Sequence, residues 1–305
     1  MTSNVKSQFL SALGDKFGVP RKLPGSQSLF ELGNGAARVY VRYSKLHPGG
    51  RTFFGLRRDD LRQLEGRASV VCFLWDGQAQ PLIIPFHEYE EVFSLVAPAS
   101  DGQYKAQVLL GDEGVELYIA KAGRFSVEAR LGWDTLSDMM DRSGFVLPPD
   151  LSHSQVQTLL GSIGTMKGFD VWVPTSDRSA LDWTVANRFQ CRDVLPAGYE
   201  SIKTVLQEID VVWIGQGANQ PLAFFEVEHS TPIYSALLRF NDVHLTAPNL
   251  GARFSVVAND ARHSLFVRQL ARPTFQASGL GSLCTFFEYG DVFSWHRRLR
   301  APTAA

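Results

Sequence analysis

Three carboxylates stand close together in two neighbouring predicted strands. Asp210 is the second residue of the mostly apolar run 209–214. Glu226 and Glu228 lie in the run 222–229, after a short connecting hairpin. Residues two apart in a strand point to the same face, so the two glutamates share a face and strand pairing can bring Asp210 beside them. Such a group repels itself unless a cation neutralises it. Hard oxygen ligands suit magnesium, with manganese as a substitute.

The surroundings of these carboxylates decide between a buried site and a solvated edge strand. A glutamate pair of the E-x-E type more often faces water. Here the acidic residues are flanked by the apolar residues Val211, Val212, Ile214, Phe224, Phe225 and Val227. This apolar setting, together with Asp210 on the neighbouring strand, favours the buried site.

Other motifs that carry chemistry are incomplete in this sequence. The glycine pairs at 33–35 and 215–217 lack the third glycine of a dinucleotide-binding fingerprint. His87 and Glu88 lack the second histidine of a zinc-protease helix, and no G-x-S-x-G or Walker sequence is present. The carboxylate group is therefore the leading candidate for catalysis.

The carboxylate pattern resembles a known family of nucleases. Asp210 followed by the E-V-E tripeptide at 226–228 resembles the PD-(D/E)XK nuclease core, in the BamHI-like variant that has glutamate in place of the usual lysine. The segments 225–242 and 272–275 are similar to segments that recur in bacterial restriction-endonuclease-like proteins. The resemblance covers about residues 154–289, although isoleucine stands where the motif has proline.

This resemblance implies a role for each residue of the site. Asp210 and Glu226 would ligate a Mg²⁺ ion, and Glu228 would replace the lysine in orienting or deprotonating the attacking water. Ser230 and Thr231, at the start of the following helix, would meet a phosphate through their backbone N–H groups, although such residues are more often simple helix caps.

The amino-terminal half contains many short strands. Alternating or continuous apolar runs predict strands at 37–43, 52–56, 69–75, 80–86, 103–110, 115–120 and 124–129, with a short helix after Asp59. This pattern indicates a small barrel, and it bears a weaker likeness to the B-three pseudobarrel, a DNA-binding fold. That likeness implies DNA contacts from residues in and near one loop, namely Arg42, Lys45, Arg51, Arg57 and Arg58. A barrel that packs on the nuclease or binds protein is an equally physical alternative.

These patterns predict a two-domain chain. We expect an amino-terminal extension over 1–30, a mainly-β pseudobarrel that reads DNA over 31–132, a linker helix over 133–152, and a nuclease domain over 153–305. The nuclease domain should be an α/β domain with a restriction-endonuclease-like mixed sheet flanked by helices.

Composition and charge agree with a globular, DNA-binding protein. The 305 residues are 45% apolar and 20% charged, which excludes disordered, collagenous and coiled-coil classes. Residues 1–67 carry twelve Lys or Arg against five Asp or Glu, an asymmetry that suits a polyanion but is also typical of a solvated basic face. The three scattered cysteines and the lack of a long apolar run predict a cytoplasmic protein with no membrane span.

The predicted function is a restriction-type, metal-dependent endonuclease that cuts double-stranded DNA. Cutting both strands usually needs two active sites, so we expect a homodimer, and a methyltransferase or another restriction-system protein is a candidate partner. The main alternative is a catalytically inactive DNA-binding or sensor protein that retains the nuclease fold. A carboxylate-pair hydrolase acting on sugars is disfavoured because nothing else marks a sugar cleft.

Overall fold

The computed structural model describes residues 2–111, 114–142, 150–217, 220–229 and 232–300. The chain divides into two compact units, residues 1–146 and residues 147–305, and each unit buries its own hydrophobic clusters. Within the described ranges, none of the helices combines the length and the apolar character needed to cross a membrane.

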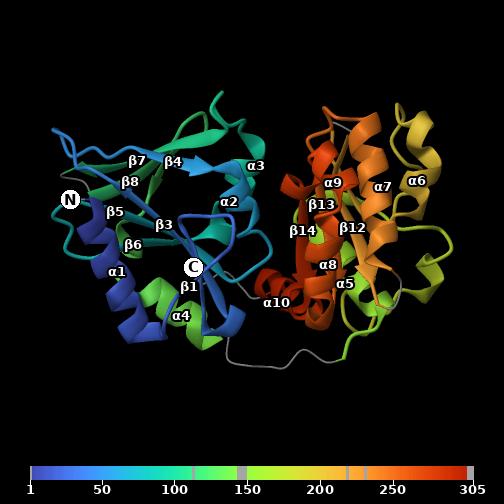
Figure 1. Ribbon diagram of the computed structural model, residues 1–305, viewed down its shortest axis with the longest axis horizontal. Helices are drawn as coiled ribbons and strands as arrows, with labels where there is room; N and C mark the ends of the chain where they lie inside the picture. Colours follow the sequence, from blue (N-terminus) through green and yellow to red (C-terminus); the bar gives the residue numbers. More distant parts are fainter. Residues whose placement is uncertain (1, 112–113, 143–149, 218–219, 230–231, 301–305) are drawn as a thin grey trace. The chain divides into compact units, whose positions relative to one another are not determined.

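The described part of the first unit holds two β-sheets with helices around them (Figure 1). One sheet has the strand order β1-β2-β3-β5-β6 and the other has the order β4-β7-β8-β9. The elements in chain order are α1 (Thr2–Phe17), β1 (Arg21–Lys22), β2 (Leu29–Leu32), β3 (Ala37–Ser44), β4 (Phe54–Arg57), α2 (Arg58–Arg62), β5 (Ser69–Trp75), β6 (Leu82–Pro85), α3 (Glu90–Leu95), β7 (Gln103–Gly111), β8 (Gly114–Ile119), β9 (Gly123–Ser126) and α4 (Asp134–Arg142).

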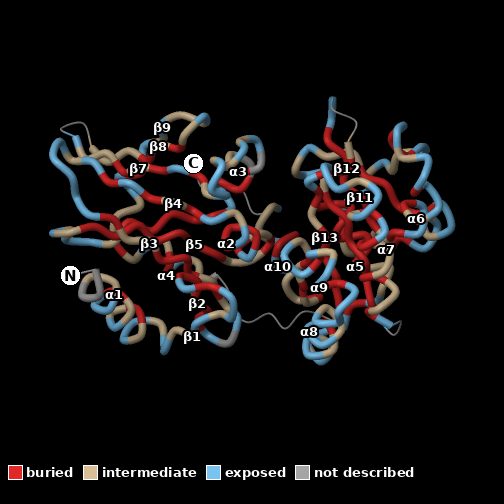
Figure 2. The backbone as a smooth tube through the Cα atoms, turned by 45° about the horizontal axis from the view of Figure 1, so that its top comes forward, coloured by how far each residue is buried: buried red, intermediate tan, exposed pale blue. Residues whose placement is uncertain are grey.

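The five-stranded sheet is covered on both faces. Its strand β5, which lies between β3 and β6, is buried along its whole length (Figure 2). Val71 and Phe73 on one face of β5 share a core with residues of β4, β7 and β8. Val70 and Cys72 on the other face pack in the cluster that contains Leu13 of α1 and Leu136 of α4. A strand buried on both faces needs a continuous apolar sequence, which is what β5 has.

The first unit extends beyond the range that we assigned to the β-rich domain. It includes α1, which we placed in an amino-terminal extension, and α4, which we placed in a linker helix. Leu13 and Leu136 are both fully buried against the five-stranded sheet, because that sheet has a second apolar face to cover. Residues 143–149 of the expected linker lie outside the described ranges.

The barrel that we expected does not close in the described strands, which form two open sheets instead. The reason lies in the pairing of β3 with β5, which is parallel. A parallel pair needs a crossover connection, and this connection contains β4 and α2. The chain thus leaves the first sheet, starts the second one and returns, whereas a meander would continue around a barrel.

The second unit is built on one five-stranded mixed sheet with the order β10-β11-β12-β13-β14. The pairs β10·β11 and β11·β12 are antiparallel, and β12·β13 and β13·β14 are parallel. The elements in chain order are α5 (His153–Met166), β10 (Phe169–Trp172), α6 (Lys203–Glu208), β11 (Val211–Gly215), β12 (Gln220–Glu228), α7 (Ile233–Thr246), β13 (Arg253–Ala258), α8 (His263–Leu270), α9 (Pro273–Ser278), β14 (Cys284–Glu288) and α10 (Tyr289–Arg300).

Helices cover both faces of this sheet, as expected for a mixed sheet flanked by helices (Figure 1). Phe225 and Val227 of β12 face the cluster that contains residues of α5 and α10. Phe224 of the same strand faces the cluster that contains residues of α6, α7, α8 and α9. By period-two alternation Glu226 and Glu228 continue the face of Phe224, towards α7.

Candidate functional site

The first carboxylate of the site, Asp210, lies directly before β11. The antiparallel register of β11 and β12 pairs Val211 with Phe225, which brings Asp210 level with Glu226 on the adjacent strand. The backbone N–H of Val227 donates a hydrogen bond of 2.7 Å to Oδ2 of Asp210. The Asp210 side chain is 15% exposed, so it reaches the surface of the cluster.

The second carboxylate, Glu226, lies in the central strand of the sheet and is 1% exposed. Both of its carboxylate oxygens accept hydrogen bonds from Arg239 of α7, with Nε at 2.6 Å from Oε1 and Nη2 at 2.8 Å from Oε2. This two-point ion pair is the geometry in which a guanidinium holds a carboxylate most firmly. The alternative of an edge strand facing water is therefore wrong for this residue.

The third carboxylate, Glu228, ends β12 and is 2% exposed. Its backbone oxygen accepts a hydrogen bond of 3.2 Å from Nη1 of Arg262, just before α8. The next residue, His229, is exposed, and its ring lies parallel to that of Tyr289 with the centroids 6.1 Å apart. Glu228 thus lies at the carboxyl end of a strand that pairs in parallel with β13, the end at which α/β sheets commonly bind ligands.

The start of α5 contributes residues that the sequence analysis did not assign to the site. Ser152 caps this helix and forms a capping box with Gln155, which holds His153 in the first turn. Nε2 of His153 lies 3.3 Å from Oδ1 of Asp210. Gln157 is 1% exposed and donates to the backbone oxygen of Asp210 at 2.9 Å.

The helix start at Ser152 has a sequence signal, because a serine followed three residues later by a glutamine can form a capping box. The approach of His153 and Gln157 to Asp210 has no sequence signal, since it joins segments that are far apart in the chain. The same holds for Arg239, whose pairing with Glu226 depends on the way α7 packs on the sheet.

The carboxylates and the histidine influence the ionisation of each other. Burial raises the pKa of Glu226 to about 8; the carboxylates of Asp210 and Glu228 add to this rise, and the hydrogen bonds from Arg239 oppose it. The hydrogen bond to Asp210 raises the pKa of His153 above its ordinary value, while partial burial opposes this rise. The cluster thus favours positive charge in its immediate neighbourhood.

The donor atoms of the site fit a hard divalent cation. Asp210, Glu226 and Glu228 offer oxygen atoms only, which is the ligand type that Mg²⁺ prefers. The ion pair with Arg239 takes one position on each oxygen of Glu226, and a carboxylate oxygen has a second lone pair. In the described ranges, however, no group of three or more His, Cys, Asp and Glu side chains is arranged so that it could hold a metal ion.

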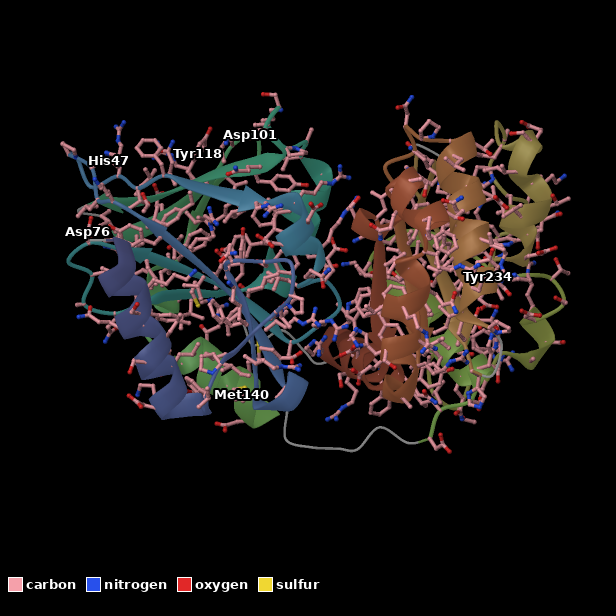
Figure 3. The ribbon with its side chains drawn as sticks, in the orientation of Figure 1. His47, Asp76, Asp101, Tyr118, Met140 and Tyr234 are labelled. Carbon is pink, nitrogen blue, oxygen red and sulfur yellow. The ribbon has the colours of Figure 1, made fainter. Side chains whose placement is uncertain are left out.

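The residues that we expected to contact DNA do not form one group. Lys45 and Arg51 are exposed in the loop between β3 and β4. Arg57 and Arg58 lie at the other end of β4, where the backbone N–H of Arg58 donates to Gly102. Figure 3 labels one residue near each pair: His47 lies in the loop with Lys45 and Arg51, and Asp101 lies next to Gly102, the partner of Arg58. The two labelled residues lie well apart in the first unit.

The remaining expected DNA contacts are less accessible or not described. Arg42 is half-buried, with Nη1 3.4 Å from the hydroxyl of Ser28 and its guanidinium over the ring of Tyr40. Its side chain is therefore partly enclosed by the first unit. Ser230 and Thr231 lie outside the described residues.

Strand β8, which carries Glu116, lies close to the loop that carries Lys45 and Arg51. Arg51 forms a β-bridge with Leu109 of β7, and Leu109 pairs in turn with Glu116 of β8. Glu116 forms an ion pair with Arg124 at 3.2 Å, which partly neutralises it. The loop and strand β8, which carries Glu116, thus share one region of the first unit.

The fold and the cluster together define the class of this protein. Its second unit is an α/β domain with a mixed five-stranded sheet, helices on both faces, and carboxylates on two adjacent strands. The family described as the Type II restriction enzyme NmeDI C-terminal domain matches residues 136–297, more than half of the chain. The chain belongs to this family.

One curated relative extends this result. The chain is 26% identical over 153 residues to the Type II restriction enzyme NmeDI of Neisseria meningitidis serogroup C, and the alignment covers 47% of this chain and 43% of that protein. The chain therefore matches less than half of the length of this relative. No solved structure matches the chain.

Proposed function

We propose that the protein is a restriction-type endonuclease that hydrolyses phosphodiester bonds in double-stranded DNA. The observation that carries this proposal is the hydrogen bond between the Val227 N–H and Asp210, which fixes the Asp210 carboxylate to the strand that carries Glu226 and Glu228, in a domain of the NmeDI C-terminal family. The relative named above is a Type II restriction enzyme, which supports the same class of reaction.

The site would work with Mg²⁺, for which Mn²⁺ could substitute. Asp210 and Glu226 would hold the ion, as in the PD-(D/E)XK pattern with glutamate in the place of lysine. When bound, such an ion lowers the pKa of water and stabilises negative charge on a phosphate. Glu228, two residues along the same face of β12, would orient or deprotonate the attacking water.

His153 would assist by holding Asp210 from the side opposite to Val227. Each oxygen of the Asp210 carboxylate has a separate neighbour, His153 at Oδ1 and the Val227 N–H at Oδ2. A carboxylate held at both oxygens has little rotational freedom, so less ordering is needed when it binds a ligand.

The first unit would recognise DNA, as the B-three likeness implies. Its exposed Lys45, Arg51 and Arg57 are suited to phosphates or to guanine edges. By the resemblance to the nuclease family, Ser230 and Thr231 would add phosphate contacts through their backbone N–H groups. A homodimer would bring two active sites to the two strands, and a methyltransferase or another restriction-system protein would complete the function.

A plasmid-cleavage experiment tests the proposal directly. Supercoiled plasmids of varied sequence and modification are incubated with the protein and Mg²⁺, with and without a chelator. We expect linear or nicked DNA only when the chelator is absent. Intact DNA with every substrate and with both Mg²⁺ and Mn²⁺ would argue strongly against an endonuclease.

A catalytically inactive DNA-binding or sensor protein is the second candidate. The observation in its favour is the ion pair that occupies both oxygens of Glu226. Calorimetry separates the two candidates, because a nuclease requires Mn²⁺ or Mg²⁺ binding that is lost in Asp210→Asn and Glu226→Gln. DNA binding with no such metal affinity would favour the second candidate.

A further inference from the structure

The ion pair between Arg239 and Glu226 has no counterpart in the sequence pattern that identified the site. Two N–H groups of Arg239 bind the two carboxylate oxygens at 2.6 and 2.8 Å, from a helix on one face of the sheet. Glu226 is 1% exposed, whereas the Arg239 side chain is 26% exposed. The carboxylate is thus enclosed, and the arginine that holds it reaches the surface.

Charge balance shows why a site of this composition needs such a residue. Asp210, Glu226 and Glu228 carry three negative charges when ionised, and a divalent cation neutralises two of them. A DNA phosphate that binds at this site brings another negative charge close to the carboxylates. Like charges that lie close together repel strongly in a partly buried setting. In the PD-(D/E)XK pattern a lysine on the strand reduces this excess, but here that position is Glu228.

Arg239 is suited to supply the missing positive charge. It contacts Glu226 directly, and a guanidinium keeps its positive charge in proteins. A guanidinium has five N–H donors, and the fork on Glu226 uses two of them. The other three donors lie outside this fork, and the side chain is 26% exposed, so an anion can approach it.

We propose that Arg239 is a positioning and charge-compensating residue of the site. It holds Glu226 by both oxygens, and its positive charge allows a site made only of carboxylates to accept a DNA phosphate together with a divalent cation. This inference rests on the proposed endonuclease function. It adds a residue on α7 to a site that the sequence places on two strands.

The test compares Arg239→Gln, Arg239→Lys and the control Arg268→Gln in the full chain. Gln removes the charge, whereas Lys keeps the charge but cannot form the two-point fork. Arg268 is an exposed arginine of α8 in the same unit, so its replacement controls for a general loss of positive charge. Two quantities are measured for each variant: Mn²⁺ affinity by calorimetry without DNA, and the single-turnover rate of plasmid cleavage.

The two measurements should change in opposite directions in Arg239→Gln. Loss of a positive charge beside the carboxylates should strengthen Mn²⁺ binding by about tenfold. Loss of the fork and of the positive charge beside the carboxylates should slow cleavage by about a hundredfold. In Arg239→Lys, Mn²⁺ affinity should stay within about threefold of the wild type while cleavage slows about tenfold, and Arg268→Gln should match the wild type in both measurements.

Several outcomes would overturn the inference. Arg239→Gln that cuts at the wild-type rate, or that binds Mn²⁺ no more tightly than the wild type, contradicts charge compensation. If Arg239→Gln does not fold, Arg239→Lys decides, because wild-type cleavage by this variant would show that the fork is dispensable. A wild-type chain that neither binds Mn²⁺ nor cuts DNA would instead refute the proposed endonuclease function. This outcome is distinct from one in which only the role of Arg239 is refuted.

Discussion

Asp210 and Val227 are joined across two strands by a hydrogen bond of 2.7 Å, in which the backbone N–H of Val227 donates to the Asp210 carboxylate. Val227 lies between Glu226 and Glu228, so this bond ties Asp210 to the part of β12 that carries both glutamates. A side chain held by the backbone of the neighbouring strand keeps its place even when a nearby side chain is replaced. This property makes the site suitable for testing by single substitutions.

Replacement of Glu226 should abolish cleavage and leave DNA binding largely intact, because under the proposed function it would remove a metal ligand and no DNA-reading residue. Glu226→Ala and the isosteric Glu226→Gln should both lower the cleavage rate by about a thousandfold or more. Plasmid cleavage and gel-shift binding measure the two quantities. If Glu226→Ala cuts at the wild-type rate, the site assignment is wrong.

Replacement of Glu228 by lysine tests its role in a different way. Glu228→Lys restores the common PD-(D/E)XK pattern, so we expect measurable metal-dependent cleavage, whereas Glu228→Ala should be inactive. The comparison is made in single-turnover cleavage assays. Wild-type cleavage by Glu228→Ala would exclude this residue from activating water.

A substitution in the core tests the packing of α5 on the sheet. A Cβ atom at Gly164 would lie 2.5 Å from Nε1 of Trp213, a fully buried residue whose N–H donates to Leu160 at 3.0 Å. Gly164→Ala should therefore lower the free energy of unfolding by about 1–3 kcal/mol, although alanine is the better helix former by about 1 kcal/mol.

Denaturant unfolding followed by tryptophan fluorescence measures this change. Thr165→Ala, at the next and exposed position of α5, serves as the control and should change the free energy of unfolding by less than about 0.5 kcal/mol. An unchanged or increased stability of Gly164→Ala would contradict the close contact between α5 and Trp213.

A buried histidine predicts how stability depends on pH. His296 is 3% exposed and lies 3.1 Å from the hydroxyl of Ser162, and burial, with the nearby charge of Arg300, lowers its pKa to about 4. The unfolded chain binds this proton more readily, so the contribution to stability is present above pH 6.5 and is lost as the pH falls towards 4. Between pH 7.5 and pH 5 the loss should be about 2 kcal/mol.

The variant His296→Gln isolates this contribution. Its free energy of unfolding should depend less on pH than that of the wild type over the same interval, as measured by denaturant unfolding at each pH. Equal pH dependence in the two proteins would mean that His296 is not held in its neutral form.

The separation of the basic residues in the first unit predicts different effects on DNA binding. If the loop that carries Lys45 and Arg51 contacts phosphates, replacing both by Ala should reduce the slope of log affinity against log salt by about two. Replacing Arg57 and Arg58 at the far end of β4 should then have a smaller effect. Equal slopes in the wild type and in both double variants would show that these residues do not contact the phosphates of DNA.

The sequence by itself determined the strands and the acidic part of the site. The apolar run at 69–75 predicted β5 at its observed bounds, because a strand buried on two faces has a continuous apolar sequence. The alternation in β12 and the short hairpin before it placed Asp210 with Glu226 and Glu228, because hairpin pairing is local. The family resemblance depended on the same residues.

Only the tertiary structure decided which residues surround these carboxylates and how the sheets form. Arg239 and His153 reach Glu226 and Asp210 from helices on the two faces of the sheet, and no periodic pattern records such long-range contacts. In the same way, α1 and α4 join the first unit because its sheet has a second apolar face, and the parallel pairing of β3 with β5 replaces the expected barrel by two open sheets. Local periodicity specifies which face of an element is apolar, whereas the partner that covers this face depends on the packing of the whole chain.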